Sequence, residues 1–343
     1  MTKKTNTRQA NFELLRILAM YLIVIWHIKG HYVDGCPGTF HPLVAKILTG
    51  LSNFISFHVD LFILITGYFG IRNNKKAIVK NLLLCAIYLC GFNLISYLHN
   101  GTFDIKEVIF PISHSPWWFM TVYFLLVLVA PFLEKMLSAL TDKEWLVWVE
   151  ILLVLNVYFG HYQHLKVVYM MGFDLMNMLT VYSLGALLRK PNLVAKFRLW
   201  GGKKSLLIAL LVLILLRIVI GKLFFKMQID ILPGEYCAPL TIALAVNVFL
   251  LFKNVSLKSS RFITFFSTSA VSVYLITEYP MVRDWLTSHY GHYYQMLCHN
   301  AVEGVLYVVF SSIMIFVVCV FIDKVRIFIQ KNIEKVVFKK LHV

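Results

Sequence analysis

Residues 12–28 read FELLRILAMYLIVIWHI, an apolar run that carries an arginine near its start and a histidine near its end. Arg16 and His27 are 11 residues apart, so on a helix with about 100° per residue they point to the same side. A rise of about 1.5 Å per residue separates them by about 16 Å along the axis. Ionisable residues are costly inside a membrane and usually mark a functional site. This pair is therefore the first candidate for one.

The composition of the whole chain is that of a membrane protein. Of its 343 residues, 59% are hydrophobic and only 15% are charged, whereas soluble domains carry about 25% charged residues. The mean hydropathy is +0.74. Apolar runs of near-spanning length recur throughout, so we predict an all-α polytopic membrane protein with about ten transmembrane helices in a single domain over residues 1–343. The predicted spans are 12–31, 47–70, 78–98, 116–134, 145–160, 166–188, 204–222, 236–253, 263–282 and 301–322.

The basic residues predict the orientation of these spans. With a cytoplasmic N-terminus, 24 of the 33 lysines and arginines fall in or beside predicted inner segments, and 7 fall outside. This distribution follows the positive-inside rule. We therefore expect both termini in the cytoplasm of a multi-pass protein of the cell (plasma) membrane. Topology and anionic lipid account for the net charge of +16, so no nucleic-acid partner is expected.

Four segments, in order, resemble a known family of integral-membrane proteins. Asn11–Ala19 followed by His27 is similar to its first helix, and Val59–Phe69 to its second-helix signature. Trp117–Leu133 resembles its fourth helix, and Val273–Pro280 a late motif. Together they resemble acyltransferase family 3, in the short form without an appended extracytoplasmic domain.

The resemblance implies an activity and its substrates. Members move acyl groups, often acetyl from acetyl-CoA, onto sugars outside the cytoplasm, and the short form is associated with O-acetylation of polysaccharides. We therefore expect acyl-CoA as a donor substrate rather than a permanently bound cofactor. The expected acceptor is an envelope glycan, such as an exopolysaccharide or capsule, or a lipid-linked sugar.

His27 is the predicted catalytic residue. Histidine suits general-base work because its pKa lies near neutrality, and it can also accept an acyl group and pass it on. Asp60 and His58 lie in the outer half of the second span, where a carboxylate would orient the His27 ring. The structural alternative makes His27 and Asp60 hydrogen-bonding residues between helices.

Three basic residues are predicted to bind the donor. Arg16 lies toward the inner face, and Arg72 and Lys75 belong to the next cytoplasmic segment, where the family often has two arginines. Lysine still binds phosphate, without the bidentate geometry of arginine. Alternatively, Arg16 reaches lipid headgroups or pairs with Glu13 one turn earlier, and the positive-inside rule alone explains the other two.

The remaining candidates have weaker signals. Glu278 is expected to pair with Arg217 or, alternatively, to act in catalysis. Trp117 is expected to belong to an outer aromatic belt or, alternatively, to a sugar-stacking platform. His31 and the other outer histidines show no metal-ligand spacing with a carboxylate, so no metal site is predicted. The six cysteines contain no C-x-x-C pair.

Two other classes of function remain open from the residues alone. A transporter or flippase for lipid-linked sugars would use the same polar residues at a midplane site formed by discontinuous helices. A non-catalytic membrane scaffold would leave Arg16 and His27 dispensable.

Overall fold

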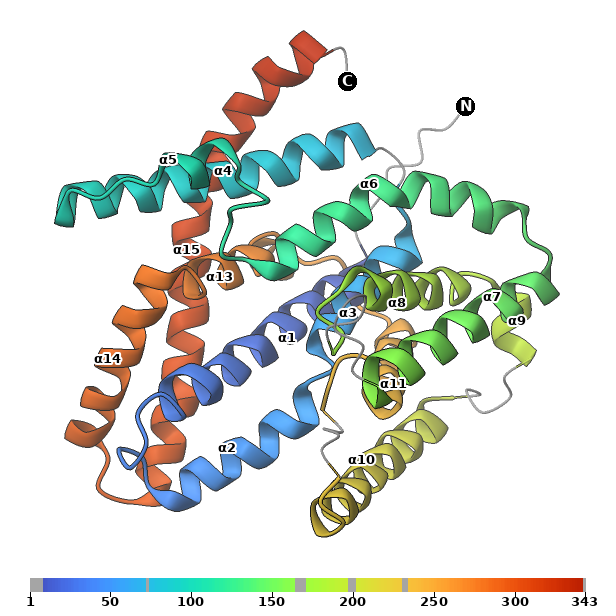
Figure 1. The fold of residues 1–343 in the computed structure, drawn as a ribbon, viewed down its shortest axis with the longest axis horizontal. Coiled ribbons are helices and arrows are strands. Elements are labelled where there is room, and N and C mark those ends of the chain that lie inside the picture. Colours follow the sequence, from blue (N-terminus) through green and yellow to red (C-terminus); the bar gives the residue numbers. More distant parts are fainter. Residues whose placement is uncertain (1–8, 72–73, 164–170, 197–201, 230–233, 342–343) are drawn as a thin grey trace.

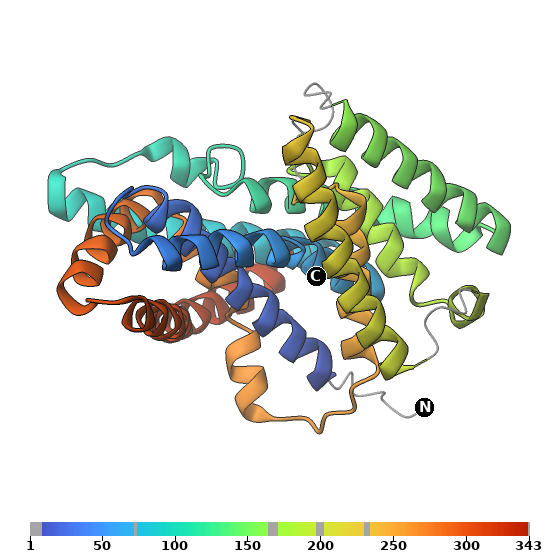
Figure 2. The ribbon, with the colours of Figure 1, turned by 90° about the horizontal axis from the view of Figure 1, so that it is seen from below.

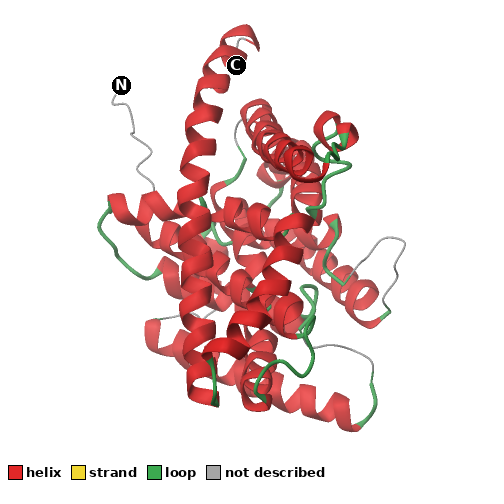
Figure 3. Ribbon diagram, turned by 90° about the vertical axis from the view of Figure 1, so that its left-hand side faces the viewer, coloured by secondary structure: helices red, strands yellow, loops and turns green. Residues whose placement is uncertain are grey.

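The computed structural model describes residues 9–71, 74–163, 171–196, 202–229 and 234–341. The secondary structure of these residues is entirely helical (Figure 3). Helices suit an apolar chain because each satisfies its own backbone hydrogen bonds without water. In order, the elements are α1 (Ala10–His27), η1 (Ile28–Val33), α2 (Pro42–Ile55), α3 (His58–Phe69), α4 (Asn74–Asn100), α5 (Ile105–Ile109), α6 (Trp118–Ala139), α7 (Asp142–Leu155), η2 (Asn156–Tyr162), α8 (Leu175–Leu187), α9 (Pro191–Lys196), α10 (Lys203–Lys226), α11 (Pro239–Lys253), α12 (Arg261–Ser267), α13 (Ala270–Thr277), α14 (Pro280–Leu297) and α15 (Ala301–Leu341).

The predicted all-helical class is confirmed, whereas the predicted count of ten spans is not. Within the described residues, seven helical segments are long and apolar enough to cross a membrane. Three shorter apolar segments, Leu175–Leu187, Pro239–Lys253 and Arg261–Thr277, fall in the remaining predicted spans. The predicted span 263–282 is interrupted, because α12, α13 and the start of α14 divide it. The last helix extends to Leu341, well beyond the predicted end at residue 322.

Helix α1 lies at the centre of the bundle. It contacts α2, α3, α11, α12, α13 and α15, and Figures 1 and 2 show these elements around it. Phe12, Leu15 and Ala19 on α1 are almost completely buried. His27 at the end of α1 is also buried, 9% exposed, so this end lies within the protein, at the place where η1 continues the chain as a π-helix.

Helices α3 and α8 make the closest packing in the molecule. A β-carbon built on Gly67 would lie 2.1 Å from the carbonyl oxygen of Tyr182, and one built on Gly185 would lie 2.3 Å from that of Leu64. Both positions require glycine because the two backbones touch there. This contact fixes α3, whose first residue is His58, next to the end of α1.

By contrast, α10 lies at the edge of the bundle, where it packs mainly on α11. Only 11% of the apolar stretch of this helix is buried inside the protein. Most of its leucines and valines are exposed or half-exposed, as expected for a helix in contact with lipid. Leu206 and Arg217 are the buried residues of this helix, and only 4% of Arg217 is exposed.

Candidate functional site

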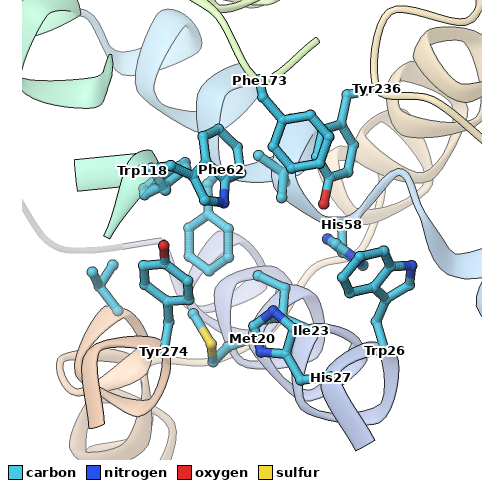
Figure 4. Close-up of a pocket in the computed structure, with 13 residues that line it drawn as sticks. Met20, Ile23, Trp26, His27, His58, Phe62, Trp118, Phe173, Tyr236 and Tyr274 are labelled. Carbon is cyan, nitrogen blue, oxygen red and sulfur yellow. The ribbon is translucent and has the colours of Figure 1, made fainter. Parts of the chain in front are cut away.

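A small aromatic cavity lies beside His27, and we call it the His27 cavity. Its walls come from α1, α3, α6, α13 and two connecting segments, and its space is ≈ 40 Å³. A cavity of that size has room for a few water molecules but not for a sugar ring. Figure 4 shows the labelled side chains around it, with His27 and Phe173 on opposite sides. The lining residues are Met20, Ile23, Trp26, His27, His58, Val59, Phe62, Trp118, Phe119, Phe173, Tyr236, Val271 and Tyr274.

The carboxylate of Glu278 contacts two histidines. Its Oε1 lies 3.0 Å from Nδ1 of His27, and its Oε2 lies 3.1 Å from Nε2 of His31. The side chains of His27 and Glu278 are only 11% and 12% exposed, whereas that of His31 is 31% exposed. Nδ1 of His27 and Oε1 of Glu278 are close enough for an ion pair, but they are not aligned for a hydrogen bond. A small rotation of the His27 ring would bring them into alignment.

Local structure explains how these three residues meet. His27 is the last residue of α1, and the π-helix η1 continues the same turn to His31. Glu278 directly follows α13, which packs on α1. Single π-helical turns are rare in proteins overall, but those that do occur are often found at functional sites. The chain thus brings one carboxylate between two ring nitrogens from consecutive turns.

This arrangement makes His27 a well-placed base. A carboxylate at Nδ1 holds the ring in one orientation and favours the tautomer in which Nε2 is free to accept a proton. It also stabilises the imidazolium that forms afterwards. Because His27 lines the cavity, a hydroxyl group that entered it would meet a base already oriented for proton transfer.

His58 enters the same cavity from the start of α3. It is 1% exposed, and neither of its ring nitrogens has a hydrogen-bond partner. Its ring centre lies 6.0 Å from that of Trp26 and 5.8 Å from that of Tyr236. A buried polar group without a partner is costly, so a ligand in the cavity would satisfy His58 by accepting or donating a hydrogen bond.

The predicted role of Asp60 beside His27 is taken by Glu278 instead. Asp60 is fully buried, and its Oδ1 accepts a hydrogen bond of 3.3 Å from Asn177. Asn177 also binds the carbonyl of Gly172 and the side chain of Asn156. Asp60 therefore belongs to a polar network between α3 and α8, behind the wall that His58 contributes.

Arg16 and Glu13 form the ion pair expected as one alternative. Nη1 of Arg16 contacts Oε1 of Glu13, whose other oxygen accepts a 2.5 Å hydrogen bond from Ser267. The Arg16 side chain is 29% exposed and that of Glu13 only 5%. The pair thus joins α1 to α12 and leaves one side of the guanidinium open.

Two residues that are predicted to bind the acyl donor, Arg72 and Lys75, are not assigned to a site by the structure. Lys75 is exposed in the first turn of α4. Arg72 lies outside the residues that the structure describes. Their assignment to the donor stays a prediction.

The predictions for Trp117 and for the partner of Arg217 are wrong. Trp117 is completely buried, which excludes it from an exposed aromatic belt. The neighbouring Trp118 lines the His27 cavity instead, with its ring centre 4.6 Å from that of Phe173. Arg217 contacts Ser56 rather than Glu278, whose carboxylate the histidines occupy.

His31 is the functional candidate that the sequence analysis missed. The signal is present, since His27 and His31 have the i, i+4 spacing that places two side chains on one helix face. His27, His31 and Glu278 place three donor atoms within 4.8 Å of one another. His161, Glu235 and Cys237 form a second such group. The absence of a metal site stays a prediction, and direct contacts already partner Glu278 and His161 in these groups.

Comparison with known proteins identifies the family. A family model described as an acyltransferase domain matches residues 9–324. Comparisons with curated proteins and with solved structures found no match. The matched region contains α1 to α14 and the start of α15, and with them every residue of the His27 cavity. The chain belongs to acyltransferase family 3.

Proposed function

We propose that this acyltransferase moves an acyl group, by resemblance acetyl, from acyl-CoA to a hydroxyl of an extracytoplasmic or lipid-linked polysaccharide at the plasma membrane. The family match supports acyl transfer. The observation that carries the proposal is the contact of Glu278 with Nδ1 of His27 at the wall of the aromatic cavity. The donor and the acceptor class come from the family resemblance.

The proposed chemistry is direct transfer with His27 as general base. Nε2 of His27 takes the proton of the acceptor hydroxyl as its oxygen attacks the thioester carbonyl. The carbon–sulfur bond then breaks, and the imidazolium returns the proton to the CoA thiolate. The atoms balance, and Glu278 stabilises the imidazolium between the two steps.

His58 and Arg16 have supporting roles in this proposal. His58 has unpartnered ring nitrogens in the cavity, and an N–H there would stabilise the oxyanion of the tetrahedral intermediate. Arg16, with Arg72 and Lys75, would bind the phosphates of CoA. An acylated His27 that passes the group to the acceptor is the competing route.

The decisive test replaces His27 by Ala in the native host, followed by NMR of the surface glycan. We expect the polymer to persist without its acyl groups. The matched control is His292→Ala, because His292 is exposed on α14 outside the cavity. O-acyl signals that persist at normal expression of the variant would refute the catalytic role of His27. Loss of the whole polymer would favour a flippase.

A further inference from the structure

Arg217 is a buried cation with unused hydrogen-bonding capacity. It lies on α10, 4% exposed, and its Nη2 donates a 2.5 Å hydrogen bond to Ser56. Its Nε and Nη1 have no partner. An arginine presents five N–H donors, and burying this charge beside a single hydroxyl is unfavourable. The position therefore suits a negatively charged ligand.

Arg217 lines a large cavity, which we call the Arg217 cavity. Its volume is ≈ 800 Å³, and its walls include α2 around Asn53 and α10 from Arg217 to Phe225. Lys222 adds a second positive charge. Glu235 is the lining carboxylate among the described residues, and His161 already binds it at 2.8 Å. Among the described lining residues, positive charges therefore outnumber negative ones.

The Arg217 cavity adjoins the His27 cavity. Trp26, Phe173 and Tyr236 line both of them. In addition, α1 and α10 run in similar directions, downward and to the left in Figure 1. Arg217 lies in the second half of α10, and His27 ends α1. A ligand held by Arg217 would thus lie on the same side as the proposed base.

The surroundings of the Arg217 cavity are apolar. Leu43, Ile47 and Leu51 on α2 are exposed, as are Leu216 and Val219 on α10. Since both walls expose apolar side chains, the cavity lies against lipid. A ligand that fits must combine an anionic group for Arg217 with an apolar part that lipid tolerates.

We propose that the Arg217 cavity binds the phosphate of a lipid-linked acceptor, and that its sugar reaches His27 past Trp26. Arginine binds phosphate through two parallel hydrogen bonds, and Nε and Nη1 are the donors left free for them. The acceptor role rests on the proposed function. The binding of a lipid phosphate at Arg217 does not, and it is tested by itself.

The experiment measures binding to the full-length protein in nanodiscs, with undecaprenyl phosphate, undecaprenol and phosphatidylglycerol as probes. We expect undecaprenyl phosphate to bind at least about tenfold more tightly than undecaprenol, because one charge-assisted hydrogen bond contributes enough free energy for that difference in affinity. Arg217→Gln should abolish that preference. Lys226→Gln is the matched control, since it removes one charge from the same helix outside the cavity, and it should keep the preference.

Two outcomes would overturn the proposal. Equal binding of undecaprenyl phosphate and phosphatidylglycerol would make the cavity a general phospholipid site. If Arg217→Gln still prefers undecaprenyl phosphate over undecaprenol, the phosphate binds at a residue other than Arg217. Ser56→Ala is a control for structural damage in the arginine variant. It removes the hydrogen bond between Arg217 and Ser56 but retains the charge of Arg217. It should therefore keep the preference for undecaprenyl phosphate. If Ser56→Ala loses the preference too, Arg217 acts as a brace between α10 and the α2–α3 junction.

The two proposals fail in different ways. His27→Ala should bind undecaprenyl phosphate as the unchanged protein does, while transferring no acyl group. Normal binding by a protein that acylates no glycan would refute the proposed function alone. Acyl transfer to a glycan without any preference for the phosphate-bearing probe would refute the Arg217 site alone.

Discussion

The single carboxylate of Glu278 contacts two histidines, and we expect the two contacts to differ in their effect on acyl transfer. His27 lines the cavity and is buried, while His31 is more exposed and lies outside the lining. Replacing Glu278 by Gln removes the charge that stabilises the His27 imidazolium. We expect kcat for acyl transfer to fall by about 10²-fold or more, with little change in KM for acyl-CoA. Steady-state assays in proteoliposomes measure both constants.

Matched variants separate this effect from damage to the fold. Glu150→Gln removes a carboxylate from the exposed face of α7 and should leave kcat unchanged. His31→Gln should reduce kcat less than Glu278→Gln, because the contact between Glu278 and His27 remains. If Glu278→Gln retains full activity at a normal melting temperature, the carboxylate does not assist His27.

The sequence predicts a role for His27 but does not predict which residues contact it. A histidine within an apolar run is conspicuous because its cost there is high. Glu278 lies 247 residues after His31, and no spacing rule connects residues so distant. Their contact depends on the packing of α13 against α1. Asp60 was the more obvious carboxylate, but tertiary packing directs it to Asn177.

Helices α3 and α8 should tolerate no added side-chain atoms at their crossing. Gly67→Ala would place a methyl group 2.1 Å from the carbonyl oxygen of Tyr182, so the two helices must separate. We expect a loss of about 1–3 kcal/mol of stability, seen as a lower melting temperature by fluorescence-detected size exclusion. Activity should fall as well, because α3 carries His58 into the cavity.

A glycine in open space provides the comparison. A β-carbon on Gly91 in α4 meets nothing within 4 Å. Gly91→Ala should therefore leave the melting temperature unchanged or raise it slightly, since alanine favours the helix. Equal melting temperatures for Gly67→Ala and Gly91→Ala would contradict the tight crossing.

Element boundaries near the site were the least predictable part of the fold. Hydropathy locates apolar runs, but it does not show where a run is interrupted. The predicted span 47–70 is broken at Ser56 and Phe57, and the span 263–282 at Thr268 and Ser269. Discontinuous helices were expected of a transporter, yet they occur in this acyltransferase, where one break lets Arg217 bind Ser56.

The orientation of the whole protein is predicted from its basic residues and can be tested directly. Both termini are predicted in the cytoplasm by the positive-inside rule. Green fluorescent protein fused after Val343 should therefore fluoresce, because it matures in the cytoplasm and not after Sec-dependent export. A fusion after Asn300, in the predicted outer segment between α14 and α15, should stay dark. The reverse pattern would invert the assignment of the two faces.

The volume of the His27 cavity has a consequence for the kinetics of the enzyme. With ≈ 40 Å³ of space, the cavity admits neither a thioester nor a sugar, so the proposed transfer at His27 requires it to open. Each turnover must include an opening step, so the observed rate contains a protein motion as well as the chemistry. While the site is closed, few water molecules can reach a donor there. Under the proposed function, the closed cavity would thus protect the acyl donor against hydrolysis that modifies no glycan.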